Sequence, residues 1–185
     1  MPLSFFPALA LIEVSSIARG MVVSDACVKK APVKLVASKP ISPGRYITVF
    51  WGEVAEVDES FRAGIEAAGD TLVDRLFLPG AHHALLAALL RVDKPANVDS
   101  IGIVETFTVA ATLLSADAAC KAAEVALLEL RLASGIGGKA YYIVSGLLHD
   151  VEASLEAGRG ILAQSQLVRT EVIPRPAPDF ADFIW

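Results

Sequence analysis

Apolar and polar residues follow one another in the first half of the chain in blocks typical of short strands and amphipathic helices. The apolar run Ala8–Val14 predicts a buried strand. The hydroxyl pair Ser15–Ser16 predicts the N-cap of a helix that continues to Lys30. Pro32 is expected to end this helix, because the residue before a proline avoids helical geometry.

A hairpin and a second amphipathic helix complete this first block. Residues 34–39 and 46–51 are rich in β-branched and aromatic side chains, and the Pro- and Gly-containing segment 40–45 between them predicts a tight turn. Apolar residues then step by three and four, which places them on one face of a helix that ends at Gly69: Val54, Val57, Phe61, Ile65 and Ala68. Residues 72–78 predict the last strand, so the order is βαββαβ, that of a ferredoxin-like sandwich.

The second half of the chain repeats this pattern. Five residues return 92 positions later in the same order, namely Glu13, Asp25, Lys29, Val33 and Leu35 as Glu105, Asp117, Lys121, Val125 and Leu127. After the hairpin the spacing becomes 94, because Gly44-Arg45 returns as Gly138-Lys139. The second copy therefore carries two extra residues in one loop. Its six elements are predicted at 100–106, 109–123, 125–132, 139–145, 148–162 and 167–173.

The repeat predicts an α/β fold of the α+β sandwich type, with two tandem ferredoxin-like domains. We expect the first domain at 1–79, a linker with a short helix at 80–99, the second domain at 100–176 and a C-terminal tail at 177–185. Two tandem copies of a small unit favour assembly over an enzyme site inside each copy, because repeated units are usually packed side by side.

Composition excludes several classes of function. The net charge is −5 and no basic run is present, so the sequence lacks the footprint of a nucleic-acid-binding protein. Charged residues interrupt every apolar stretch before the roughly 18 residues that a membrane span needs, and the first residues lack a signal-peptide pattern, so the cytosol is the expected compartment. Cys27 and Cys120 have no CxxC spacing and are expected to be reduced and buried.

Several short segments resemble the shell domains of bacterial microcompartments, and they occur in both copies. They are Ile12-Glu13-Val14, Asp25-Ala26-Cys27-Val28-Lys29, Pro43-Gly44-Arg45, Ile103-Val104-Glu105-Thr106, Ala116-Asp117-Ala118-Ala119-Cys120-Lys121, Ser134-Gly135-Ile136-Gly137-Gly138-Lys139 and Val172-Ile173-Pro174-Arg175-Pro176. The chain is most similar to the tandem-domain, trimer-forming shell proteins of the propanediol-utilisation type. This resemblance covers nearly the whole sequence.

The resemblance implies a homotrimer whose six domains form a flat pseudohexagonal tile, packed edge to edge with hexameric tiles in a shell inside the cytoplasm. The two hairpin tips would line a central pore, with Ile41, Ser42, Pro43 and Gly44 from the first copy and Ser134, Gly135, Ile136, Gly137 and Gly138 from the second. Backbone amides, hydroxyls and small side chains favour the passage of small polar or anionic metabolites. Taken without the resemblance, Pro and Gly at these positions indicate only a tight hairpin.

Some tandem shell proteins carry a cysteine in the first loop and hold an iron–sulfur cluster on the axis. This chain has Ser42 there, and a serine hydroxyl is a poor ligand for cluster iron compared with a thiolate. We therefore expect no cluster and no other cofactor. If the purified protein were brown and absorbed visible light, the alternative of an electron-transfer shell protein would be restored.

Three basic residues match positions along the tile edge of the family: Lys29, Lys121 and Arg175. Each lysine also lies four residues after an aspartate, Asp25 or Asp117, which alone predicts a solvated helical ion pair. The two interpretations are compatible. The resemblance favours the expectation that these three residues contact the neighbouring tile.

No residue pattern predicts catalysis or a metal site. Three histidines, His82, His83 and His149, lack ligand spacing, and neither a Ser-His-Asp nor a Cys-His arrangement is apparent. The remaining alternative is a cytosolic small-ligand-binding or regulatory module, because ferredoxin-like sandwiches host many unrelated functions. Aromatic and apolar residues at both ends are expected to dock on the protein's own surface rather than on cargo: Phe5, Phe6, Phe180, Phe183, Ile184 and Trp185.

Overall fold

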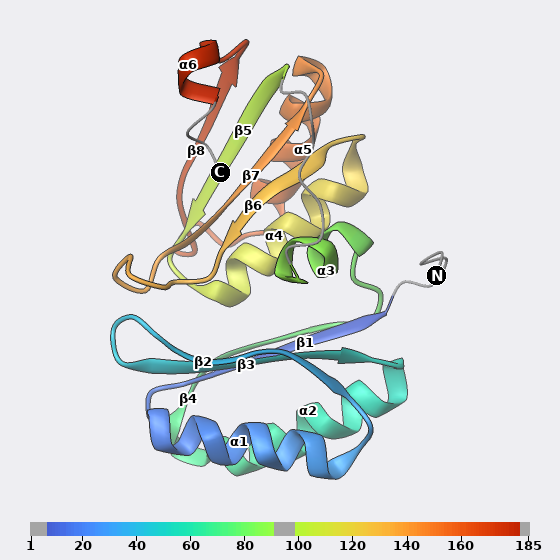
Figure 1. The fold of residues 1–185 in the computed structure, drawn as a ribbon, viewed down its shortest axis with the longest axis vertical. Coiled ribbons are helices and arrows are strands. Elements are labelled where there is room, and N and C mark those ends of the chain that lie inside the picture. Colours follow the sequence, from blue (N-terminus) through green and yellow to red (C-terminus); the bar gives the residue numbers. More distant parts are fainter. Residues whose placement is uncertain (1–6, 91–98, 182–185) are drawn as a thin grey trace. The chain divides into compact units, whose positions relative to one another are not determined.

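The computed structural model describes residues 7–90 and 99–181, and it contains two four-stranded sheets, each with two helices on one face (Figure 1). The chain divides into two compact units, one of residues 1–83 with 134–138 and one of residues 84–133 with 139–185. Each sheet is antiparallel throughout. The predicted fold class, two tandem βαββαβ domains, is confirmed.

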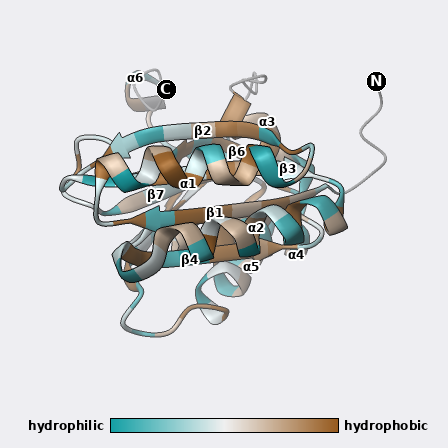
Figure 2. Cartoon of the chain, turned by 90° about the horizontal axis from the view of Figure 1, so that it is seen from below, coloured by the Kyte–Doolittle hydropathy of each residue, from teal (hydrophilic) through white to brown (hydrophobic). Residues whose placement is uncertain are grey.

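The first copy has the predicted six elements and one additional turn of 3₁₀ helix. They are β1 (Ala8–Val14), α1 (Ile17–Lys30), β2 (Lys34–Ile41), β3 (Arg45–Gly52), α2 (Val54–Ala68), η1 (Gly69–Thr71) and β4 (Leu72–Leu78). The strand order is β2-β3-β1-β4, so β1 lies in the middle of the sheet and is the strand most protected from water. Figure 2 shows β1 hydrophobic along most of its length.

The core of the first copy lies between its sheet and its helices. Alternate residues of β1 point to this side and pack with Val23 and Cys27 of α1 and Val57 and Ala68 of α2. The predicted apolar face of α2 is confirmed except at its first residue, because Val54 is exposed. That residue is the first of the helix, and it is not part of the apolar cluster that the rest of the face joins.

The second copy has the same architecture. Its elements are β5 (Ser100–Thr106), α4 (Val109–Ala122), β6 (Ala126–Arg131), β7 (Ala140–Gly146), α5 (Leu148–Gly160) and β8 (Leu167–Pro174), in the sheet order β6-β7-β5-β8. Two further short helices lie outside the copies, α3 (His83–Leu90) and α6 (Pro178–Ala181). The helix at 84–90 was predicted, whereas α6 was not.

The first helix of each copy begins and ends by the same local devices. Ser16 and Thr108 are N-caps, and each hydroxyl accepts a hydrogen bond of 3.2 Å from the backbone N–H three residues later. Pro32 follows α1 as expected, but α4 ends at the equivalent residue with Glu124 in that position. Proline is therefore not required. In both copies an extended residue, Ala31 or Ala123, turns the chain into the next strand.

Candidate functional site

The first hairpin tip is short. Ile41 is the last residue of β2 and is buried, Ser42 is half-buried, and Pro43 and Gly44 are exposed. Gly44 has a backbone φ of +70°, a conformation that residues other than glycine rarely adopt. Three residues thus make the exposed tip, and Ile41 anchors it to the sheet.

The second tip is longer and contains three glycines at positive φ: Gly135 at 79°, Gly137 at 66° and Gly138 at 89°. Residue pairing shows where the two extra residues lie. Lys39 pairs with Ile47 in the first hairpin, and Arg131 pairs with Tyr141 in the second. The 92-residue offset therefore holds up to Arg131 and the 94-residue offset holds from Tyr141, which places the insertion in the tip, as predicted.

Residues 134–138 group with the first compact unit through contacts with Ser42 and Pro43. The backbone N–H of Gly135 donates a hydrogen bond to Ser42 Oγ at 3.3 Å. A Cβ atom on Gly138 would lie 3.1 Å from Pro43 Cδ and 3.3 Å from the carbonyl oxygen of Ser42. Within this unit, glycine at 138 thus allows a close approach that a side chain would prevent.

A carboxylate–cation pair supports the base of each tip, and the sequence analysis did not identify it. Arg45 follows the first tip and donates to Glu13 Oε1 at 2.8 Å, whereas Lys139 follows the second and donates to Glu105 Oε1 at 2.9 Å. All four residues belong to the 92- and 94-residue repeat. The recurrence of an acid and a base together was the signal that could have revealed these pairs.

Burial distinguishes the two carboxylates. Glu13 is only 1% exposed, and among the described residues its Oε2 has no hydrogen-bond partner. Burial raises the pKa of Glu13, although the hydrogen bond and charge of Arg45 lower it. Across the sheet, Glu13 faces Asp74, whereas Glu105 faces Arg169. The first pair therefore lies in a more acidic setting than the second.

The predicted edge residues lie on exposed parts of each copy. Lys29 Nζ is 2.6 Å from Asp25 Oδ2, and Lys121 Nζ is 2.5 Å from Asp117 Oδ2, so the helical ion pairs expected from the spacing are present. Arg175 is exposed just after β8 at φ +49°, and its backbone N–H donates to the carbonyl oxygen of Asp99 at 3.0 Å. All of these contacts lie within one chain. The contacts with a neighbouring tile stay a prediction.

Both cysteines are free and buried, as expected, and burial raises the pKa of each thiol to about 12. Within residues 7–90 and 99–181, no group of three or more His, Cys, Asp or Glu residues is arranged to hold a metal ion. In the same residues no helix is long and apolar enough to cross a membrane. Phe180 is exposed in α6, and the other aromatic terminal residues lie outside the described part of the chain.

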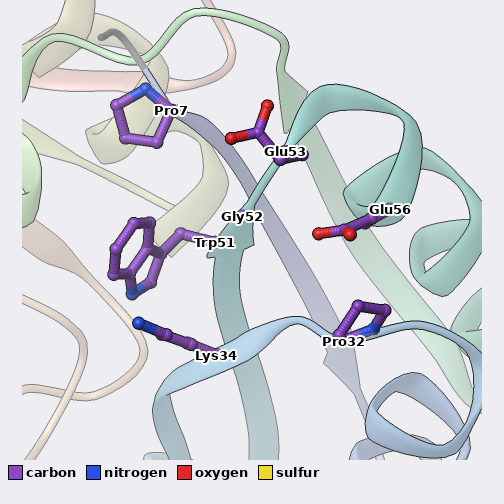
Figure 3. Close-up of a pocket in the computed structure, with 7 residues that line it drawn as sticks. All are labelled: Pro7, Pro32, Lys34, Trp51, Gly52, Glu53 and Glu56. Atoms are coloured by element: carbon purple, nitrogen blue, oxygen red, sulfur yellow. The ribbon is translucent and has the colours of Figure 1, made fainter.

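A pocket of about 340 Å³ opens at the end of the first sheet that lies opposite the hairpin tip (Figure 3). It is lined by Pro7, Pro32, Lys34, Trp51, Gly52, Glu53 and Glu56. The ammonium of Lys34 lies 5.1 Å from the centre of the Trp51 ring. The sequence analysis did not predict this pocket, because its residues come from three segments that are far apart in the sequence.

Comparison with known proteins agrees with this architecture. A family model described as the BMC domain matches residues 8–81 and again residues 100–176. The bacterial microcompartment shell protein PduT of Citrobacter freundii is 40% identical over 170 residues, which cover 91% of this chain and 92% of that protein. The carboxysome assembly protein CcmO of Synechococcus elongatus is 29% identical over 188 residues, covering 95% of this chain and 67% of that protein.

Solved structures give the same result. A crystal structure of a microcompartment protein from Desulfitobacterium hafniense is 36% identical, with a TM-score of 0.91 over 96% of this chain and 99% of that one. A fused, permuted hexameric shell protein of the RMM microcompartment is 25% identical, with a TM-score of 0.63 over 83% of this chain and 82% of that one. This chain belongs to the BMC-domain family of microcompartment shell proteins and carries the domain twice.

Proposed function

We propose that three copies of this structural shell protein close into a pseudohexameric tile, with the hairpin tips around a central pore for small polar metabolites. The tile would lie in the shell of a microcompartment in the cytoplasm and meet hexameric shell proteins at its edges. Two copies of one domain in each chain carry the proposal, because three such chains supply the six wedges of a hexagon.

An exposed apolar stripe on α1 supports contacts between chains. Ile17, Met21 and Val28 lie on one side of this helix and are 40%, 58% and 40% exposed. Figure 2 shows hydrophobic segments interrupting the hydrophilic surface of α1. The equivalent residues of α4, which are Val109, Leu113 and Cys120, are 0%, 0% and 5% exposed. The same helix is thus covered in one copy and open in the other, as expected if another chain covers it.

The second sheet offers a surface that fits this stripe. On β5, Gly102 faces α5, because a Cβ there would meet Leu155 and Val151, so Ile101 and Ile103 point to the opposite face. An apolar cluster occupies that face, formed by Ile101, Ile143, Ile103, Leu128, Tyr141 and Ile173. We infer that it receives the α1 stripe of the next chain. Such a contact joins two different surfaces, and contacts of this type generate closed rings.

Charge substitutions test this contact. In Met21→Glu a carboxylate would be buried in the interface without a partner, which costs several kcal/mol, so the trimer is expected to dissociate. Val22→Glu is the matched control, because Val22 is 50% exposed but lies about 100° around the helix from Met21. Analytical ultracentrifugation measures both. A wild-type monomer, or a Met21→Glu protein that remains trimeric, would refute the arrangement.

The pore proposal concerns Ser42, Pro43 and Gly44 of the first tip and the segment 134–138 of the second. Its support is the exposure of Pro43, Gly44, Gly135 and Gly137 and the presence of hydroxyl and backbone N–H groups at both tips. Hydrogen-bonding groups of this kind favour polar solutes without holding them at one strong site. Buried Ile41 would fix the position of the tip instead of contacting the solute.

A crosslinking experiment tests where the tips lie. Ser42→Cys places a thiol on the first tip, and mild oxidation of the trimer should join two of the three chains by a disulfide. Glu53→Cys is the control just past the opposite end of β3, where the proposed arrangement would place the thiols of one trimer too far apart to react. The native cysteines are buried and stay inert. Equal crosslinking of both variants in a denaturing gel, or none of Ser42→Cys, would refute the pore.

A further inference from the structure

One face of the first sheet carries charged side chains at the base of the first hairpin tip. Alternate residues of β1 pack toward the helices, so Glu13 points to the opposite face. It pairs with Ile47 of β3 on one side and with Asp74 of β4 on the other. Arg45, the first residue of β3, follows the tip and donates to Glu13 Oε1 at 2.8 Å. Figure 1 shows the end of β1 and the tip between β2 and β3 at the same end of this sheet.

Asp74 places a second carboxylate beside Glu13. Residues that pair directly across antiparallel strands share a face, with Cβ atoms about 4.5–5.5 Å apart. Asp74 is half-buried, and its Oδ1 accepts a hydrogen bond of 2.8 Å from the backbone N–H of Arg75. Two neighbouring carboxylates repel each other when both are ionised, so one of them keeps its proton to a higher pH.

Glu13 is the more deeply buried of the two acids, and its burial is poorly compensated. Its side chain is 1% exposed, and Oε2 has no hydrogen-bond partner among residues 7–90 and 99–181. Such an oxygen costs more to bury as part of a charged group than as part of a neutral one. Burial raises the pKa of Glu13, Arg45 lowers it and the charge of Asp74 raises it, so the net change is upward from 4.5.

Few other charged groups lie near this face in the described part of the chain. The elements that pack most closely against β1 are β3, β4, α1 and α2, and both helices lie on the opposite face. Arg75 is the next residue of β4 and points to the helix side. Lys39 of β2 faces the same side as Glu13 but is separated from it by β3. Arg45 and Asp74 are therefore the charged groups that face Glu13 directly.

The protonation of Glu13 changes the charge at the base of the tip. When Glu13 is ionised, its charge balances that of Arg45. When Glu13 is protonated, the charge of Arg45 is unbalanced and the base of the tip gains one positive charge. The Arg45 side chain is 33% exposed, so this charge acts on the water around the tip. In the proposed trimer it would occur three times around the pore.

The second copy lacks the acid pair. Glu105 is the equivalent carboxylate, and its side chain is 35% exposed. Across the sheet it faces Arg169 instead of an acid, and Lys139 lies 2.9 Å from its Oε1. The two copies share their fold, so this difference is one of side-chain chemistry. The inference therefore concerns the first tip alone.

We propose that Glu13 controls the charge selectivity of the pore: its protonated form leaves Arg45 unbalanced, and the first tips then favour anionic solutes such as carboxylates. Its ionised form neutralises Arg45, and the preference for anions weakens as pH rises. Asp74 acts through Glu13 by setting the pH at which this change occurs. The selectivity rests on the proposed function of the tips, whereas the charge change belongs to each chain.

Thiol-modification rates at the tip measure this charge. In Ser42→Cys the thiol is modified by two methanethiosulfonates of similar size, the anionic sulfonatoethyl and the cationic trimethylammonioethyl reagent. The ratio of their rates cancels the ionisation of the thiol, because both react with the same thiolate. At low ionic strength the anionic-to-cationic ratio should rise at least about twofold as pH falls from 8 to 4. A ratio that does not depend on pH would overturn the proposal.

Three variants in the Ser42→Cys background assign the change. Glu13→Gln should show the high ratio at every pH, because glutamine leaves Arg45 unbalanced. Asp74→Asn should move the midpoint to lower pH, since it removes the like charge, whereas Asp70→Asn in η1 is the matched exposed control and should not. A pH step that persists in Glu13→Gln, or an unchanged midpoint in Asp74→Asn, would overturn the assignment. Asp74→Asn keeps the test available if Glu13→Gln does not fold.

The disulfide test of Ser42→Cys separates this inference from the proposed function. Crosslinking together with a pH-independent rate ratio refutes the role of Glu13 and leaves the pore intact. A pH-dependent ratio without crosslinking refutes the pore and with it the control of selectivity. Crosslinking together with a ratio that rises at low pH supports both.

Discussion

Substituting Gly158 by alanine should loosen the contact between the two helices of the second copy. A Cβ at this position would lie 2.4 Å from Tyr142 Oη and 2.9 Å from Ser115 Oγ. Ser115 Oγ donates to the carbonyl oxygen of Gly158 at 2.9 Å, so its one proton is used and Tyr142 must donate to it at 2.9 Å. Tyr142 is fully buried, so its ring cannot move out of the way without displacing other core residues. The added methyl group therefore displaces either the ring or the helix.

The expected size of the effect follows from three contributions. Overpacking of a closed core costs about 1–3 kcal/mol, and loss of the hydrogen bond between Ser115 and Tyr142 costs about 1 kcal/mol. Alanine recovers about 0.9 kcal/mol through its greater helix propensity. The free energy of unfolding should thus fall by about 2 kcal/mol, which corresponds to a decrease in Tm of about 4–8 °C for a chain of this size.

Urea unfolding followed by circular dichroism, at one fixed protein concentration, measures this difference. Gly160→Ala is the matched control, because it lies in the same helix and a Cβ there would meet nothing within 4 Å. It should leave stability unchanged or raise it by up to about 1 kcal/mol. A Gly158→Ala protein as stable as the Gly160→Ala protein would show that the close contact does not constrain the helices.

Three further predictions concern single groups. Cys27 and Cys120 should resist iodoacetamide at pH 8 in the native protein, since both are buried with pKa values raised to about 12, and should react in urea; mass spectrometry distinguishes the two results. Because the folded-state pKa of Glu13 is raised, its contribution to stability is full below the ordinary value of 4.5 and is lost as pH rises through the folded pKa. Glu13→Gln should remove this decline from urea unfolding curves recorded between pH 4 and 8, and an unchanged pH profile would contradict the assignment. Ser16→Ala should lower the free energy of unfolding by about 1 kcal/mol through loss of the N-cap, and a Ser16→Thr protein should retain most of it.

Local patterns in the sequence were sufficient for the elements and their order. The strand predicted at 8–14 is β1 without change, and the strand predicted at 100–106 is β5, because strands in the middle of a sheet are apolar along most of their length. The repeat located the second copy even where its composition differs from that of the first. The ends of other strands were predicted less accurately: β2 extends two residues past the predicted 34–39 to Ile41, and β3 extends one residue beyond each end of the predicted 46–51.

Local patterns did not predict which side chains of these elements would be buried. The α1 stripe and the equivalent residues of α4 are both apolar at helical spacing, yet one set is exposed and the other is buried. Ile41 was predicted at the tip and proved to be buried within the sheet, whereas Gly138 is buried by its approach to Ser42 and Pro43. Spacing along the chain predicts which side chains share a face, but not what covers that face.

The sequence alone determined that the chain holds two copies of one βαββαβ unit, which family that unit resembles, and where its two hairpin tips lie. These properties depend on residues close together in the chain, or on the comparison of two segments position by position. Only the tertiary structure decided the ion pairs at the base of the tips and the pocket of Pro7, Pro32, Lys34, Trp51, Gly52, Glu53 and Glu56. Each of these joins residues from separate strands and helices, and such contacts exist only once the sheet brings its strands into register.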